Sequence, residues 1–65
     1  MNLPDEIESQ KNAIKVEWLA TKLNVSPKTL YKMAKRGRIP SFRIGYSVRF
    51  NPKAVADWLR RRMSD

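Results

Sequence analysis

The side chains of this sequence that could bind a ligand are mainly cations. Between Glu17 and Asp57 there are nine basic residues and no acidic one. They are Lys22, Lys28, Lys32, Lys35, Arg36, Arg38, Arg43, Arg49 and Lys53. An ordinary solvated surface mixes both signs of charge, because a long stretch of one sign repels itself. The pattern, with a formal net charge of +8 for the whole chain, indicates a polyanionic partner, with nucleic acid favoured over a membrane surface.

Other kinds of chemistry are excluded by what the sequence lacks. It has no cysteine and no histidine, which removes disulfides, the usual zinc ligands and the usual general base. Three of the six acidic residues crowd the N-terminus and the other three stand singly, so a carboxylate pair or a hard-metal cage is not expected. We therefore expect no enzyme activity, no cofactor, no metal and no small-molecule ligand.

The length and hydropathy of the chain predict one small domain. Sixty-five residues leave no room for a second one, and no apolar run exceeds three residues, so neither a signal peptide nor a membrane span is expected. We expect a cytoplasmic protein that lies on the nucleoid when it is bound. Residues 1–13 combine low hydrophobicity with three acids and one lysine, and they predict a flexible acidic N-terminal tail. Residues 14–65 form the expected domain, with thirteen bases and three acids, a net charge of +10.

A first helix followed by a tight turn opens this domain. Apolar residues at positions 16, 19, 20 and 23 follow helical spacing, and Asn24 is a plausible left-handed stop. Ser26 and Pro27 are a hydroxyl N-cap and a favoured first helical residue, so a second helix is predicted from there to about Arg36, before Gly37. Two helices so closely joined predict a helix-turn-helix.

The second predicted helix has two opposed faces. On a helical wheel, one side is apolar and the other side is cationic. The apolar side carries Leu30, Met33 and Ala34, and the cationic side carries Lys28, Lys32 and Lys35.

After residue 40 the apolar residues alternate, which predicts a β-hairpin. The alternating residues are Phe42, Ile44, Val48 and Phe50. Keeping all four on one face requires a three-residue loop at 45–47, with position 44 opposite position 48. In that register Arg43 faces Arg49, and this like-charged pair would need an anion nearby. Asn51 and Pro52 then open a third helix, whose predicted buried face includes Val55, Trp58 and Leu59.

Seven short segments between Ile14 and Leu59 occur in an order typical of one family. They are Val16-Glu17, Leu23-Asn24-Val25-Ser26, Thr29-Leu30-Tyr31-Lys32, Gly37-Arg38-Ile39-Pro40, Arg43-Ile44-Gly45, Arg49-Phe50 and Trp58-Leu59. On these residues the chain resembles the excisionase family of DNA-binding domains, which are related to the DNA-reading part of MerR-type regulators. The resemblance implies a mainly α fold with a short β-hairpin, a miniature winged helix-turn-helix, and double-stranded DNA as the partner.

The resemblance also assigns DNA-binding residues. In phage excisionases the second helix enters the major groove, and the matching exposed positions are Lys28 and Lys32, with Lys35 on the same face. Ser26 and Thr29 are then expected near the DNA backbone. Lysine can donate to guanine O6 and N7 or to phosphate, and only the first of these contacts reads sequence.

The hairpin corresponds to the family's wing, which reaches the adjacent minor groove or its phosphates. This implies roles for Arg43, Tyr46 and Arg49. The wing tip of the family often carries a basic residue after the glycine, whereas here Tyr46 and Ser47 follow Gly45. We therefore expect a contact from the Tyr46 hydroxyl to phosphate rather than arginine insertion.

Three roles remain open at this point. An excisionase-like accessory factor for site-specific recombination in a phage or other mobile element would work with an integrase or recombinase and could self-associate cooperatively on DNA. A small transcription regulator would instead occupy an operator. A protein-interaction adaptor would use the N-terminal tail and Trp18, which lies away from the apolar face of its helix; the alternative for Trp18 is that it covers the hydrophobic rim beneath the tail.

Overall fold

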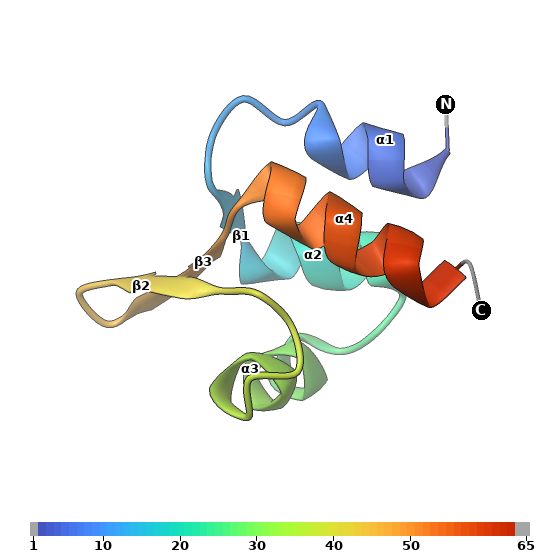
Figure 1. Cartoon of the computed structure of the whole chain (residues 1–65). Coiled ribbons are helices and arrows are strands. Elements are labelled where there is room, and N and C mark those ends of the chain that lie inside the picture. The colour runs from blue at the N-terminus through green and yellow to red at the C-terminus, as the bar shows by residue number, and fades with distance from the viewer. Residues whose placement is uncertain (1, 64–65) are drawn as a thin grey trace.

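The computed structural model describes residues 2–63, which form four helices packed on one another and a small antiparallel sheet that extends from one side of them (Figure 1). The elements are α1 (Leu3–Glu8), β1 (Ile14–Lys15), α2 (Val16–Leu23), α3 (Pro27–Lys35), β2 (Phe42–Ile44), β3 (Ser47–Phe50) and α4 (Pro52–Met63). The strand order is β1-β3-β2. This arrangement confirms the predicted miniature winged helix-turn-helix. Among residues 2–63, no helix has the length and apolar character needed to cross a membrane.

The helix ends follow the capping residues that the sequence predicts. Asn24 ends α2 in the left-handed region, with φ 58° and ψ 44°. The Ser26 hydroxyl accepts a hydrogen bond from the Thr29 N–H at 3.1 Å and so caps α3. The Asn51 side chain does the same for α4, accepting from the Ala54 N–H at 2.9 Å. The turn between α2 and α3 is therefore fixed by local chemistry at both of its ends.

The core lies between α2, α4 and the inner face of the sheet. Leu19 of α2, Leu30 of α3, Phe50 of β3 and Val55 of α4 are all fully buried within it. Leu30 is the one fully buried side chain that α3 contributes. Trp58 adds a second link to this region, because its indole N–H donates to the carbonyl oxygen of Arg38, just after α3, at 2.9 Å. These contacts fix how α3 sits against the body of the domain.

The prediction of a flexible tail is wrong for Leu3–Glu8, because these residues form helix α1. The Asn2 side chain caps this helix by accepting from the Asp5 N–H at 2.9 Å. Ile7 is fully buried, and Leu3, four residues earlier, packs against the same core. A helix of six residues is unstable alone, so docking of its apolar side stabilises it, and this contact is long-range in sequence. The boundary between residues 13 and 14 remains a prediction.

The predicted register of the hairpin is also wrong. Arg43 pairs with Val48, Ile44 pairs with Ser47, and the loop is the two residues Gly45 and Tyr46. Gly45 has φ 61°, the sign required at the first central position of a type II′ turn. Such a turn matches the right-handed twist of the two strands. The turn geometry therefore outweighs the alignment of all four apolar residues on one face.

The sheet consequently presents two different faces, because residues directly opposite each other share a face. Strand β1, which the sequence analysis did not predict, adds the pairs Ile14 with Phe50 and Lys15 with Arg49. The inner face carries Ile14, Arg43, Val48 and Phe50. The outer face carries Lys15, Phe42, Ile44, Ser47 and Arg49.

Candidate nucleic-acid interface

Helix α3 exposes the cationic face that the sequence predicts. Lys28, Lys32 and Lys35 are all exposed, whereas Leu30 is fully buried. Met33 and Ala34 are half-buried and pack against the core, which confirms the division of this helix into two sides. Because i, i+4 and i+7 positions lie along one side of a helix, the three lysines form a row about 10 Å long.

The two hydroxyls at the start of α3 have different hydrogen-bonding capacity. Ser26 donates to the Thr29 hydroxyl oxygen at 2.9 Å and also accepts from the Thr29 N–H. Its proton is therefore used within the cap. The Thr29 hydroxyl accepts in this pair and keeps its own proton, so it can donate to an oxygen outside the protein. Both residues are exposed, but only the Thr29 hydroxyl keeps a proton for an acceptor outside the protein, and Ser26 holds that hydroxyl in place.

The three wing residues of the prediction do not gather on one surface. Tyr46 is fully exposed at the tip, Arg43 is exposed, and Arg49 is half-buried with its guanidinium donating to the carbonyl oxygen of Val48 at 2.9 Å. The predicted pairing of Arg43 with Arg49 is wrong, because the shorter loop places them on opposite faces of the hairpin. The like-charged pair in the sheet is instead Lys15 with Arg49.

Four of the acidic residues, Asp5, Glu6, Glu8 and Asp57, lie on α1 and α4. Arg60 of α4 binds Asp5 at 2.8 Å, Glu8 at 2.6 Å and Asp57 at 3.1 Å. The hydrogen bonds to Asp5 and Glu8 raise the pKa of the Arg60 guanidinium above its ordinary value. Asp5 and Glu8 of α1 are thus directed toward α4 rather than toward α3.

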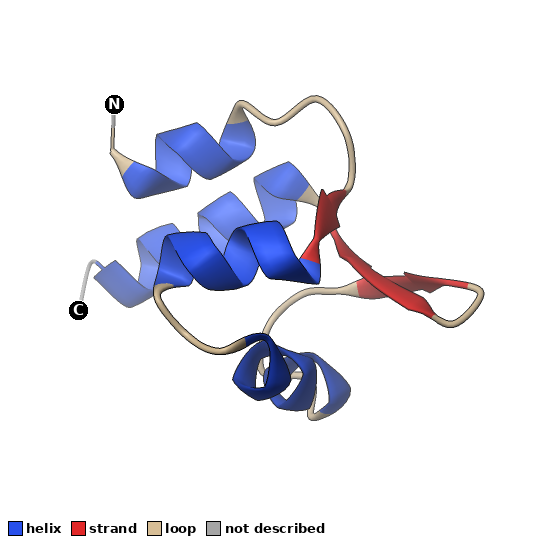
Figure 2. Ribbon diagram, turned by 180° about the vertical axis from the view of Figure 1, so that it is seen from behind, coloured by secondary structure: helices blue, strands red, loops and turns tan. Residues whose placement is uncertain are grey.

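The remaining ion pairs also lie among α1, α2 and α4. Lys22 of α2 binds Glu6 of α1 at 2.5 Å, and Lys53 binds Asp57 within α4 at 3.4 Å. The ion pairs described within residues 2–63 thus join α1, α2 and α4, and none of them involves α3, β2 or β3. Figure 2 shows α1 and α3 on opposite sides of the domain. The cations of α3 and the hairpin therefore have no carboxylate partner among residues 2–63.

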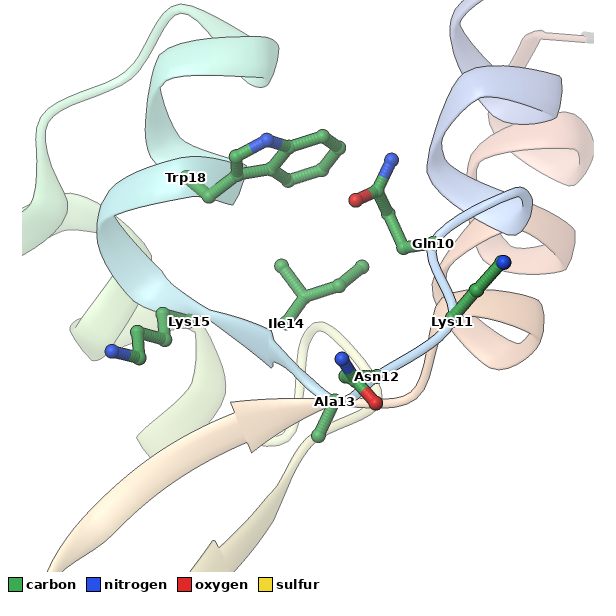
Figure 3. A pocket seen from close by; sticks show the side chains of 7 residues that line it. All are labelled: Gln10, Lys11, Asn12, Ala13, Ile14, Lys15 and Trp18. Carbon is green, nitrogen blue, oxygen red and sulfur yellow. The ribbon is translucent and has the colours of Figure 1, made fainter.

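Trp18 borders the one hollow that we describe on residues 2–63. It is about 350 Å³ in volume, and Figure 3 shows Trp18 and Ile14 beside the Gln10 side chain there. Its lining residues are Gln10, Lys11, Asn12, Ala13, Ile14, Lys15 and Trp18. Trp18 is half-buried against the core, and the Lys22 ammonium lies 5.4 Å from its ring centroid. This arrangement supports the interpretation that Trp18 covers the hydrophobic rim beneath the N-terminal segment.

The sequence analysis missed three side chains beside the predicted site. Lys15, Phe42 and Ile44 lie on the outer face of the sheet next to Arg49. A glycine followed by one further turn residue is a known signal for a two-residue hairpin loop. A two-residue loop at Gly45 and Tyr46 predicts the observed register, with Phe42 and Ile44 on the outer face of the sheet.

A helix-turn-helix with an exposed cationic second helix and a hairpin at its side defines the class of winged helix-turn-helix DNA-binding domains. Residues 14–63 match the family described as Helix-turn-helix domain, so the chain belongs to this family, whose type is that of the excisionases. It is accordingly a DNA-binding helix-turn-helix protein. Searches of curated proteins and of solved structures gave no match.

Proposed function

We propose that this protein binds double-stranded DNA with sequence preference, placing α3 in the major groove and the hairpin over the adjacent minor groove or its phosphates. The observation that carries the proposal is the exposed row of Lys28, Lys32 and Lys35, on a helix that has no acidic residue and no ion pair with the rest of residues 2–63. A B-DNA major groove is about 12 Å wide and admits one α-helix.

The proposed DNA contacts are of two kinds: contacts to bases, which read the sequence, and contacts to phosphates, which position the protein. Lys28 and Lys32 lie one turn apart and can donate to guanine O6 and N7 at neighbouring base pairs. Thr29, with its free hydroxyl proton, and Lys35, at the end of the helix, are suited to phosphates. The partial positive charge at the N-terminus of α3 strengthens a phosphate contact there.

The wing supplies further positioning contacts. Arg43 and Arg49 lie on opposite faces of the hairpin, so they can neutralise phosphates of the two strands that flank one groove. Tyr46 stands at the tip between them. Arginine contacts of this kind carry affinity but no sequence information, so the wing fixes the orientation in which α3 reads the bases.

The biological role that we propose is that of an excisionase-like accessory factor for site-specific recombination in a mobile element. The excisionase type of the family supports it. A domain of this size engages about five or six phosphates, which gives a slope of log K against log salt of about −5 and weak binding by one copy. We therefore propose that neighbouring copies bind cooperatively or that a recombinase binds alongside, on DNA in the cytoplasm.

Selection from a pool of random duplexes, followed by footprinting and a circular-permutation bending assay, tests this role. We expect footprinting to show several phased sites and the bending assay to show bent DNA. A single isolated site without a bend would assign the protein to operator binding as a small transcription regulator. Retention of a protein partner at high salt, in the absence of DNA, would favour an adaptor instead; the half-buried position of Trp18 and the folded α1 speak against that role.

A further inference from the structure

The hairpin exposes apolar side chains that the fold does not use. Phe42 is 41% exposed, Ile44 is 61% exposed and Tyr46 is 101% exposed. They occupy the outer face and the tip, so no part of the core described for residues 2–63 covers them. Most exposed apolar residues of a protein are scattered singly, whereas these three follow one another on the projecting end of one hairpin.

The charges around this apolar strip identify what can cover it. Its neighbours in the sheet are Lys15, Arg43 and Arg49, and neither hairpin strand carries an acidic residue. A second copy docking here would bring another chain of net charge +8 against these cations. A surface that is both apolar and anionic suits the strip better, and the hairpin is continuous with the proposed DNA-binding helix through residues 36–41 (Figure 1).

The minor groove of DNA has this combination. Its walls are deoxyribose rings, which are largely apolar, and its edges are phosphates. An undeformed groove is about 6 Å wide, whereas two paired strands lie about 4.8 Å apart before their side chains are added. With its side chains added, the two-stranded body of the hairpin is broader than the groove and cannot enter it. The single side chains at its tip are narrow enough to enter.

We propose that Tyr46 and Ile44 form an apolar tip that packs between the sugar walls of the minor groove, while Arg43 and Arg49 hold the phosphates on either side. This inference rests on the proposed DNA binding and adds what the wing contributes to it. Apolar contact releases no counterions, so the tip supplies a part of the affinity that salt does not weaken. The Tyr46 ring, rather than its hydroxyl, makes the contact.

Fluorescence anisotropy with a short labelled A·T-rich duplex, repeated over a range of salt concentrations, tests the inference. Tyr46→Ser and Ile44→Ser should each weaken binding about three- to tenfold at every salt concentration and leave the salt slope unchanged. Tyr46→Phe should bind as the wild type does. Met63→Ser is the matched control, because Met63 is also 61% exposed but lies on α4. The substituted side chains are exposed, so folding is retained, and circular dichroism checks it.

A second arm locates the contact on the DNA. Filling the minor groove of the same duplex with netropsin should weaken the wild type more than either single substitution does, and it should leave a Tyr46→Ser, Ile44→Ser double variant unaffected. The inference is overturned if Tyr46→Phe loses as much affinity as Tyr46→Ser, if the drug affects both proteins equally, or if the substitutions change self-association measured without DNA. Failure of the wild type to bind any duplex is a different result, and it would overturn the proposed function itself.

Discussion

The two sides of this domain treat their charged and apolar groups differently. On the side of α1 and α4, Arg60 meets three carboxylates and Ile7 is sealed in the core. On the side of α3 and the hairpin, the lysines have no described ion pair and Tyr46 projects into solvent. We call these the compensated side and the open side. We infer from this difference that the first side stabilises the fold, and we propose that the second side binds a ligand that supplies the missing anions.

The compensated side should give the largest effect on stability. Ile7→Ala removes a fully buried side chain and should lower the free energy of unfolding by about 2–5 kcal/mol. Urea denaturation followed by circular dichroism measures this, with Met63→Ala as an exposed control. Molecules that remain folded should bind DNA as the wild type does. Equal stability of the two variants would show that α1 does not belong to the core.

The open side should give the largest effect on recognition. Lys32→Ala should weaken binding to the selected site by about 1–3 kcal/mol and reduce discrimination between sites, because a lysine contact to guanine is lost. Anisotropy with the selected and a scrambled duplex measures both quantities. Lys53→Ala is the control, since Lys53 is exposed on α4 and paired with Asp57. Unchanged binding by Lys32→Ala would remove α3 from the role of recognition helix.

Replacing a wing arginine should change the salt dependence of DNA binding rather than the discrimination between DNA sequences. Arg43→Ala should weaken all duplexes alike and make the slope of log K against log salt shallower by about one, because one phosphate contact is lost. A salt titration on two unrelated duplexes measures the slope. An unaltered slope would place Arg43 away from the DNA.

The smallest effect on DNA binding is expected at Arg60. Its charge is balanced by Asp5, Glu8 and Asp57, so Arg60→Gln should leave the salt slope unchanged and lower the melting temperature slightly. The same titration and a thermal melt measure the two effects. A shift of the slope as large as that expected for Arg43→Ala would show that the two sides are not distinct.

The parts of this structure that depend on local chemistry could be predicted from the sequence. Ser26 and Asn51 cap α3 and α4 through contacts only three residues away, and Asn24 ends α2 through its own backbone conformation. The opposed faces of α3 follow equally from helical periodicity.

The parts of the structure that depend on competing or distant interactions could not be predicted from the sequence. The hairpin register was a choice between apolar alternation and the turn preference of Gly45, and the turn preference prevailed. Helix α1 needs contacts with α4, more than 40 residues later in the sequence, and the Arg60 guanidinium joins it there to Asp5. In the proposed site, the row of lysines was therefore predicted, whereas the placing of Arg43 and Arg49 on opposite faces required the structure.

The central claim is that α3 and the hairpin together form the DNA-binding surface. Titration of the isotope-labelled protein with the selected duplex, followed by the backbone amide signals in two-dimensional NMR spectra, tests it most directly. We expect the signals of residues 27–36 and 42–49 to move, while those of α1 and of the hollow beside Trp18 stay in place. Movement confined to α1, α4 or that hollow would contradict it.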